Sequence, residues 1–233
     1  MIEVKNLTKS FGNTVAVKNM TFNVDKGEIY CLLGANGAGK TTTINLLLNL
    51  VQPENGNAKI GGMNTDDYPL KTKQKLTYIP ENLSLYPSLS GVENLRFFSG
   101  LSGIKLSNND AASYLKEAGL QLDAADKRVG VYSKGMRQKV AIALALARKS
   151  KVLLLDEPTS GLDPAASSDF AMLLTDMKER GAAILMATHD LFRAKETGTK
   201  IGIMNKGTLV EELAATDVTH SDLEKIYLNH MRA

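Results

Sequence analysis

The nine residues Gly34–Thr42 constrain this chain more than any other part of its sequence. They match the pattern G-x-x-x-x-G-K-[ST] in full and lie between two apolar stretches, Ile29–Leu33 and Thr42–Val51. Glycines let the backbone curl so that successive N–H groups point at phosphate oxygens, and the positive end of a following helix faces the same point. The pattern therefore predicts a nucleoside triphosphate site between a buried strand and a helix.

The residues of this loop have different predicted roles. Lys40 can reach the β- and γ-phosphates, and the Thr41 hydroxyl can bind Mg²⁺. The other residues expected to surround the phosphates are Gly34, Ala35, Asn36, Gly37, Ala38, Gly39 and Thr42. The loop therefore predicts a nucleoside triphosphate bound together with Mg²⁺.

A second informative segment is the apolar run Val152–Leu155, which ends in Asp156 and Glu157. Successive strand residues point to opposite faces, so we expect the two carboxylates to have different roles. Asp156 is expected to hold Mg²⁺, and Glu157 to orient or deprotonate the attacking water. Two exposed acids after a core strand are the alternative, but the complete phosphate loop earlier in the chain favours the catalytic interpretation.

Short apolar runs alternate with helical patterns before residue 60 and again after residue 150. The expected strands are Ile2–Lys5, Ala16–Val24, Glu28–Leu33, Asn57–Ile60, Leu76–Ile79, Val152–Leu155, Ala183–Ala187, Ile201–Met204 and Thr208–Glu211. This alternation predicts an α/β core with a largely parallel sheet. The stretch from about residue 87 to about 149 has a helical pattern throughout, which predicts a helical lobe inserted into that core.

Residues at element ends refine this prediction. Ser133 is expected to cap a helix that runs to about Lys149, and Asp163 followed by Pro164 to begin another. The segment Met204–Thr208 is expected to form a hairpin turn, because Asn and Gly tolerate positive φ.

Composition and charge exclude several classes of protein. The chain has 233 residues, 43% of them hydrophobic and 23% charged, which suits one large domain or one domain with an inserted lobe. A net charge of +3 gives no indication of nucleic-acid binding. The segment Met1–Lys5 does not resemble a signal peptide, and Val140–Ala147 is far shorter than the roughly 20 apolar residues of a membrane span. With Cys31 as its single cysteine the chain forms no internal disulfide, so we expect a cytoplasmic location.

Taken together, these segments resemble the ATP-binding cassette (ABC) family over almost the whole chain. Gly34–Thr42 is similar to the Walker A motif and Val152–Glu157 to Walker B. Ser160–Asp163 is similar to the D-loop, and His189 to the catalytic switch histidine. Phe11 lies where the family places an aromatic residue that stacks on adenine. The order and spacing of the motifs carry this resemblance.

The resemblance implies the fold of a P-loop ABC ATPase. This is an α/β fold with a RecA-like mixed-sheet core, an N-terminal antiparallel β subdomain and an inserted helical lobe. It implies a single domain over residues 1–233, with the lobe at about 87–149. A short C-terminal helix is expected at about 221–231, where Ser221–Leu228 has apolar residues at helical spacing.

Two positions differ from the commonest family pattern. The signature motif, usually L-S-G-G-Q, is matched by Tyr132–Met136, which retains Ser133 and Gly135. The Q-loop position holds Glu81 in place of glutamine, and this residue is expected to add negative charge near Mg²⁺. Both departures resemble the ATPases of type-2 ABC exporters, so an exporter is expected.

The mechanism that the resemblance implies is a head-to-tail dimer with two ATP molecules bound between the subunits. Each site would combine residues of one subunit with two residues of the other: Lys40, Thr41, Asp156, Glu157 and His189 from the first, Ser133 and Gly135 from the second. Homodimer and heterodimer both remain open. The implied partner is a transmembrane permease, through which alone the ATPase would contact the inner face of the cell membrane. Leu83–Tyr86 and the region of Phe97 are expected to line a groove for a short cytoplasmic helix of that permease.

Two other interpretations have to be weighed against a transporter ATPase. An ABC-type ATPase without a transport role would be expected to carry two tandem cassettes or a long coiled-coil insertion, and this chain shows neither pattern. A P-loop kinase or GTP-binding switch would share only the phosphate loop. A guanine-reading Asn-Lys-x-Asp segment is not present, because Asn205-Lys206 is followed by Gly207-Thr208. The sequence therefore favours the transporter ATPase.

Overall fold

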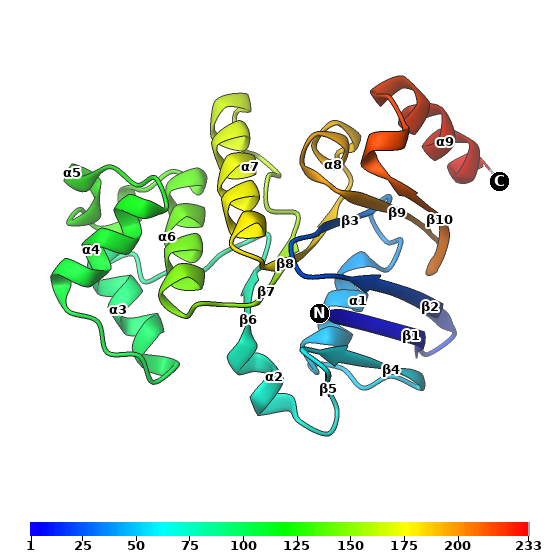
Figure 1. Cartoon of the computed structure of the whole chain (residues 1–233), viewed down its shortest axis with the longest axis horizontal. Coiled ribbons are helices and arrows are strands. Elements are labelled where there is room, and N and C mark those ends of the chain that lie inside the picture. The colour runs from blue at the N-terminus through cyan, green and yellow to red at the C-terminus, as the bar shows by residue number, and fades with distance from the viewer. Residues whose placement is uncertain (233) are drawn as a thin grey trace.

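The computed structural model describes residues 1–232, and its centre is a six-stranded sheet (Figure 1). The strands follow the order β10 (Thr208–Ala214), β9 (Lys200–Asn205), β3 (Ile29–Leu33), β8 (Ala183–Thr188), β7 (Val152–Asp156) and β6 (Leu76–Ile79). All neighbouring pairs are parallel except β9 and β10, which are antiparallel. The predicted α/β core with a largely parallel sheet is confirmed.

The central strands are apolar throughout because both faces of the sheet are covered. In β3, Cys31 and Leu33 belong to the core under the long helices, whereas Tyr30 and Leu32 face the core on the other side. Continuous apolar runs are typical of parallel strands covered on both faces. Each fully buried leucine in such a strand contributes about 1.5–3 kcal/mol relative to an exposed one.

A smaller antiparallel sheet covers one face of the central sheet. Its order is β2 (Thr14–Val24), β1 (Ile2–Phe11), β4 (Asn55–Ile60) and β5 (Met63–Asn64). Helix α1 (Lys40–Leu47) contacts both sheets (Figure 1). Its residues Ile44 and Leu47 are fully buried in the core between the sheets. This arrangement places the start of α1 where the two sheets meet.

Helices cover the opposite face and extend to one end of the molecule (Figure 1). The helices after β7 are α7 (Pro164–Glu179), α8 (Leu191–Thr197) and α9 (His220–Arg232). Between β6 and β7 lie α3 (Gly91–Leu101), α4 (Asn108–Glu117), α5 (Leu122–Ala125), the 3₁₀ helix η1 (Val129–Val131) and α6 (Lys134–Ala147), while α2 (Pro69–Lys75) precedes β6. None of the helices within residues 1–232 combines the length and the apolar character that crossing a membrane would require.

The predicted helix starts are confirmed by their capping bonds. The Ser133 hydroxyl accepts a hydrogen bond from the backbone N–H of Met136 at 3.2 Å, and Asp163 caps α7 in the same way. Such a cap contributes about 1 kcal/mol. Helix α6 ends at Ala147, before the predicted Lys149, which has a φ of 51° and so cannot continue the helix.

Several strand ends differ from the prediction. Strand β1 continues to Phe11 rather than ending at Lys5, because a bulge with Asn6 at a φ of 51° carries it through a polar segment. The two-residue strand β5 was not predicted, since so short a strand has no periodicity. The division into one domain with a lobe at about 87–149 stays a prediction, and Ala233 lies outside the described residues.

Candidate active site

A cavity of about 310 Å³ lies where the phosphate loop meets the carboxyl end of β7. The carboxyl ends of parallel strands are where open α/β sheets bind their ligands. The cavity is lined by Thr14, Val15, Ala16, Asn36, Gly37, Ala38, Gly39, Lys40, Thr41, Thr42, Glu81, Asp156 and Glu157. The structure thus brings most of the loop residues together with all three carboxylates predicted from the sequence, while Gly34 and Ala35 form the start of the loop.

The loop requires glycine where it turns into α1. Gly39 has a φ of 106°, and a Cβ there would collide with the carbonyl oxygen of Ala16 on β2. A Cβ on Gly34 would collide with the carbonyl oxygen of Met204 on β9. The loop is therefore packed between two strands, and its N–H groups and the start of α1 face the cavity.

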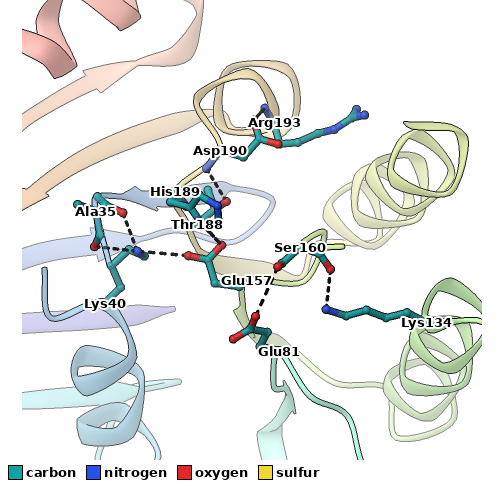
Figure 2. Close-up of polar contacts among 11 residues, drawn as sticks. Ala35, Lys40, Glu81, Lys134, Glu157, Ser160, Thr188, His189, Asp190 and Arg193 are labelled. Carbon is teal, nitrogen blue, oxygen red and sulfur yellow. Dashed lines mark hydrogen bonds and ion pairs between the residues drawn. The ribbon is translucent and has the colours of Figure 1, made fainter. Parts of the chain in front are cut away.

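The Lys40 ammonium is turned back onto its own loop. Its Nζ donates hydrogen bonds to the carbonyl oxygens of Gly34 at 2.6 Å and Ala35 at 3.2 Å. The same Nζ lies 3.2 Å from Oε1 of Glu157 (Figure 2). The side chain of Lys40 is only 6% exposed. A phosphate that binds Lys40 must therefore replace these partners.

Glu157 lies one residue past the end of β7, in a left-handed conformation with a φ of 46°. We expected strand alternation to point the side chains of Asp156 and Glu157 to opposite faces. The structure corrects this expectation, because Glu157 lies outside β7 and the left-handed turn sets the direction of its side chain. Its backbone N–H donates to the carbonyl oxygen of Ala187 on β8. A residue other than glycine in this region costs roughly 1–3 kcal/mol, and such strain concentrates at functional sites.

His189 contacts the far side of the Glu157 carboxylate. Its Nδ1 lies 2.9 Å from Oε2 of Glu157, and its backbone N–H is 3.3 Å from the same oxygen (Figure 2). His189 follows β8 directly and precedes α8, which is capped by Asp190 through a bond from the Arg193 N–H. Glu157 is therefore held between Lys40, the first residue of α1, and His189, which lies just after β8.

Asp156 meets the requirements of a ligand for a divalent cation. It is the last residue of β7 and is 6% exposed, and its Oδ1 has no hydrogen-bond partner among residues 1–232. Burial raises the pKa of this carboxyl above its ordinary range, with further increases from the charges of Glu157 and Glu81. The Thr41 hydroxyl and the Lys40 ammonium act in the opposite direction. A buried carboxylate oxygen without a partner, next to a hydroxyl, fits Mg²⁺.

The raised pKa of Asp156 predicts that this residue destabilises the nucleotide-free protein. When the pKa of a carboxyl is higher in the folded than in the unfolded chain, the free energy of unfolding of the protein falls as the pH rises through the folded-state pKa. We therefore expect Asp156→Asn to raise Tm at neutral pH by about 2–4 °C, corresponding to about 1 kcal/mol. Differential scanning fluorimetry without nucleotide measures this. The exposed Asp176→Asn serves as control, and an unchanged or lower Tm for Asp156→Asn would contradict the expectation.

The remaining predicted site residues lie outside the lining of this cavity. Phe11, at the end of β1, is 51% exposed and pairs with Thr14, which is part of the lining. Ser133 and Gly135 lie at the start of α6. Sequence reasoning missed the contribution of Thr14–Ala16, whose part in the cavity arises only from the packing of β2 against the loop.

Comparison with known proteins decides the family. The family model described as ABC transporter matches residues 17–160, which is more than half of the chain. The chain belongs to the ABC transporter ATPase family. It is therefore an ATP-binding subunit of the ABC type, and the prediction from its motifs is confirmed.

Curated relatives of this ABC ATPase are similar over nearly its whole length. The bacitracin transport ATP-binding protein BcrA of Enterococcus faecalis is 36% identical over 94% of this chain and 70% of its own. The linearmycin resistance ATP-binding protein LnrL of Bacillus subtilis (strain 168) is 33% identical over 94% of this chain and 70% of its own. The protein described as "Probable multidrug ABC transporter ATP-binding protein YbhF", of Escherichia coli (strain K12), is 37% identical over 90% of this chain, which spans only 36% of that relative.

Solved structures confirm the fold class of the ABC ATPase. A structure described as the ATP binding subunit of an ABC transporter has a TM-score of 0.84 and 31% identity, covering 98% of both chains. A dimeric ATP-binding cassette in a post-hydrolysis state, bound to ADP and Pi, has a TM-score of 0.81 and 29% identity, covering 92% of this chain and 99% of the other.

Proposed function

We propose that this ABC ATPase hydrolyses ATP in a composite dimer site and thereby drives a separate transmembrane permease of an exporter. The observation that carries this proposal is the Glu157 carboxylate, which lies between Lys40 and His189 beside the phosphate loop. The names of the relatives, which include bacitracin transport and linearmycin resistance, support export over an ABC-type ATPase without a transport role.

The residues at the cavity have different roles in ATP hydrolysis. The Lys40 ammonium leaves the Gly34 and Ala35 carbonyls and Glu157 and binds the β- and γ-phosphates instead. The N–H groups of the loop also donate hydrogen bonds to these phosphates. Glu157, now free of Lys40, accepts a proton from the attacking water, and His189 orients its carboxylate. Mg²⁺, when bound, neutralises charge on the phosphates. The residues that would hold it are Thr41 and Asp156, with Glu81 beside them.

Phe11 is assigned as the residue on which the adenine base stacks. Its ring is half exposed at the edge of the cavity, next to Thr14 on the paired strand. The Lys9 ammonium lies 5.4 Å from the ring centroid on one face of the ring. Stacking of a base on such a ring contributes about 1–3 kcal/mol.

The positions of Ser133 and Gly135 support a head-to-tail dimer. Neither residue is part of the lining of the described cavity, although the start of α6 offers a hydroxyl and N–H groups that suit a γ-phosphate. In the dimer these donors reach the ATP of the other subunit. Each such donor is worth about 10²–10³ in rate, by analogy with measured oxyanion-hole donors. The pair of ATPases can be two copies of this chain or this chain and a second one.

The docking site of the permease is assigned to an apolar hollow of about 140 Å³ between β6, α3 and α6. Its lining is Thr77, Tyr78, Leu83, Ser84, Leu85, Leu95, Phe98, Val140, Ala141 and Leu144. The exposed ring of Tyr86 lies beside it, 4.9 Å from the ring of Phe97 and 6.0 Å from that of Phe98. A short cytoplasmic helix of the permease fits such a groove by its apolar face. The ATPase would then lie at the cytoplasmic face of the membrane and contact it only through the permease.

Combined alanine substitution of Leu83, Leu85 and Tyr86 is expected to abolish co-purification with the permease. The ATPase activity of the isolated chain should change less than about threefold, because these side chains do not line the ATP cavity. Pull-down from detergent-solubilised membranes measures binding to the permease. The control is Met172→Ala, an exposed apolar residue on α7. Intact co-purification of the triple variant would exclude this groove.

A further inference from the structure

Lys134 replaces the first glycine of the usual signature motif, and its side chain has a definite partner. The Nζ atom donates a hydrogen bond of 2.6 Å to the carbonyl oxygen of Ser160, in the loop between β7 and α7 (Figure 2). Lys134 is the first residue of α6 and is half-buried. A charged donor that is partly removed from water makes a stronger bond than a neutral one.

A second side chain of α6 holds the same loop. The Gln138 amide, one helical turn after Lys134, donates to the carbonyl oxygen of Pro158 and is fully buried. Two adjacent side chains of one helix face thus bind two carbonyl groups of one loop. The start of α6 and the loop are therefore expected to move as one unit.

The opposite side of the loop faces Glu81. The Ser160 hydroxyl donates to Oε1 of Glu81 at 3.4 Å, while the Ser160 carbonyl accepts from Lys134 (Figure 2). Beside these groups lies a cavity of about 290 Å³ whose lining includes Glu81, Lys134 and Gln138. Glu81 and Lys134, two of the residues that depart from the commonest family pattern, are thus both bonded to Ser160.

This loop begins directly after the catalytic carboxylate. Glu157 precedes Pro158, and the Ser160 N–H donates to the Glu157 carbonyl oxygen at 3.2 Å, which closes a turn. Holding Ser160 and Pro158 therefore restricts the backbone of Glu157, which is already in the left-handed region. A shift of about 1 Å in a catalytic group can cost about 10²-fold in rate.

From this geometry we propose that Lys134 is a positioning residue, which fixes Glu157 of its own chain through the Ser160 carbonyl. The inference rests on the proposed dimer, in which the start of α6 serves the ATP of the other subunit. Lys134 then connects the two sites: it moves with Ser133 at the partner's ATP and holds the loop beside its own Glu157. This assigns Lys134 an effect within its own chain rather than a contact with the ATP across the dimer.

Mixed dimers separate these two roles of Lys134. Two differently tagged chains, of which one carries Glu157→Gln, are purified as a mixed dimer in ATP without Mg²⁺, and single turnover is started with Mg²⁺. The single active site then uses Glu157 of one chain and Ser133 of the other. We expect Lys134→Met to slow turnover about tenfold when it is on the chain with the intact Glu157. The same change on the Glu157→Gln chain should slow turnover less than about twofold.

Further variants exclude a loss of folding as the cause. In the homodimer, Lys134→Arg retains a donor for the Ser160 carbonyl and should keep turnover within about threefold of the wild type. Lys134→Met should lower kcat with a change in KM for ATP of less than about twofold, because Lys134 does not line the cavity at the phosphate loop of its own chain. Thermal unfolding of each variant is measured alongside.

The opposite pattern would overturn the inference. A tenfold loss only when Lys134→Met is on the Glu157→Gln chain would make Lys134 a ligand of the ATP across the dimer. Equal losses in both arrangements, or a loss that follows Tm and is not rescued by Lys134→Arg, would give it a general structural role. A reference mixed dimer without any Lys134 change that fails to turn over would contradict the proposed composite site, and with it the inference.

Discussion

Replacement of Glu157 by glutamine is expected to lower the turnover number for ATP by about 10²–10⁴-fold while ATP still binds. Glutamine keeps the size of the side chain and its contact with His189, but it cannot accept a proton from the attacking water. It also removes the negative charge that lies 3.2 Å from the Lys40 ammonium, so Lys40 is freed for the phosphates. ATP should therefore bind at least as tightly as in the wild type.

The assay measures turnover against protein concentration. Turnover per subunit of the wild type is expected to rise with concentration, because each site needs residues of a second subunit. The Glu157→Gln variant should be nearly inactive at every concentration and should form dimers with ATP and Mg²⁺, which analytical ultracentrifugation detects. The control is Glu179→Gln, an exposed carboxylate near the end of α7. Substantial activity in Glu157→Gln would remove this residue from the role of base.

Two inactive variants are expected to restore activity when mixed. Lys40→Ala removes the phosphate ligand of its own site, and Ser133→Asp places a negative charge against the ATP of the other subunit. Aspartate is itself a good N-cap, so the start of α6 should be preserved. A mixed dimer retains one site with both residues intact. With random association, an equal mixture should reach about a quarter of wild-type turnover, since half of the dimers carry one working site.

The matched control for this experiment uses residues from the same side of the site. A mixture of Lys40→Ala and Glu157→Gln should stay inactive, because each site of the mixed dimer then lacks one of these two residues. Steady-state phosphate release at a concentration that favours dimers measures both mixtures. Complementation in neither mixture would contradict the cross-subunit site. Complementation in both would mean that the residues do not share one site.

The parts of the fold that could be predicted are those with a strong local pattern. The run Ile29–Leu33 is continuous and apolar because both faces of β3 are covered, and the capping residue Ser133 fixes its helix start by a local bond. The extension of β1 past Lys5 depends on the bulge at Asn6, which no apolar periodicity marks. Local patterns therefore give the elements, while their irregular ends depend on tertiary pairing.

The candidate site shows the same division between local and tertiary information. The phosphate loop and the acidic pair are contiguous in the sequence, so Lys40 and Asp156 could be named from spacing alone. The contact between His189 and Glu157 joins the ends of two strands, and the left-handed turn at Glu157 has no sequence signal because glutamate rarely adopts it. The bond from Lys134 to Ser160 could not be predicted either, since it joins residues that only the packing of α6 brings together.

The resting position of Lys40 has a consequence for the choice of ligand. While its ammonium binds the Gly34 and Ala35 carbonyls and the Glu157 carboxylate, Lys40 is held by three partners and presents no free cation to solvent. A nucleoside that reaches only the edge proposed to bind the base, at Phe11, leaves that arrangement undisturbed. Phosphate oxygens at the depth of the loop compete for the ammonium, and by taking it they release the carboxylate. Binding of the triphosphate and release of the Glu157 carboxylate from Lys40 are thus a single exchange of partners.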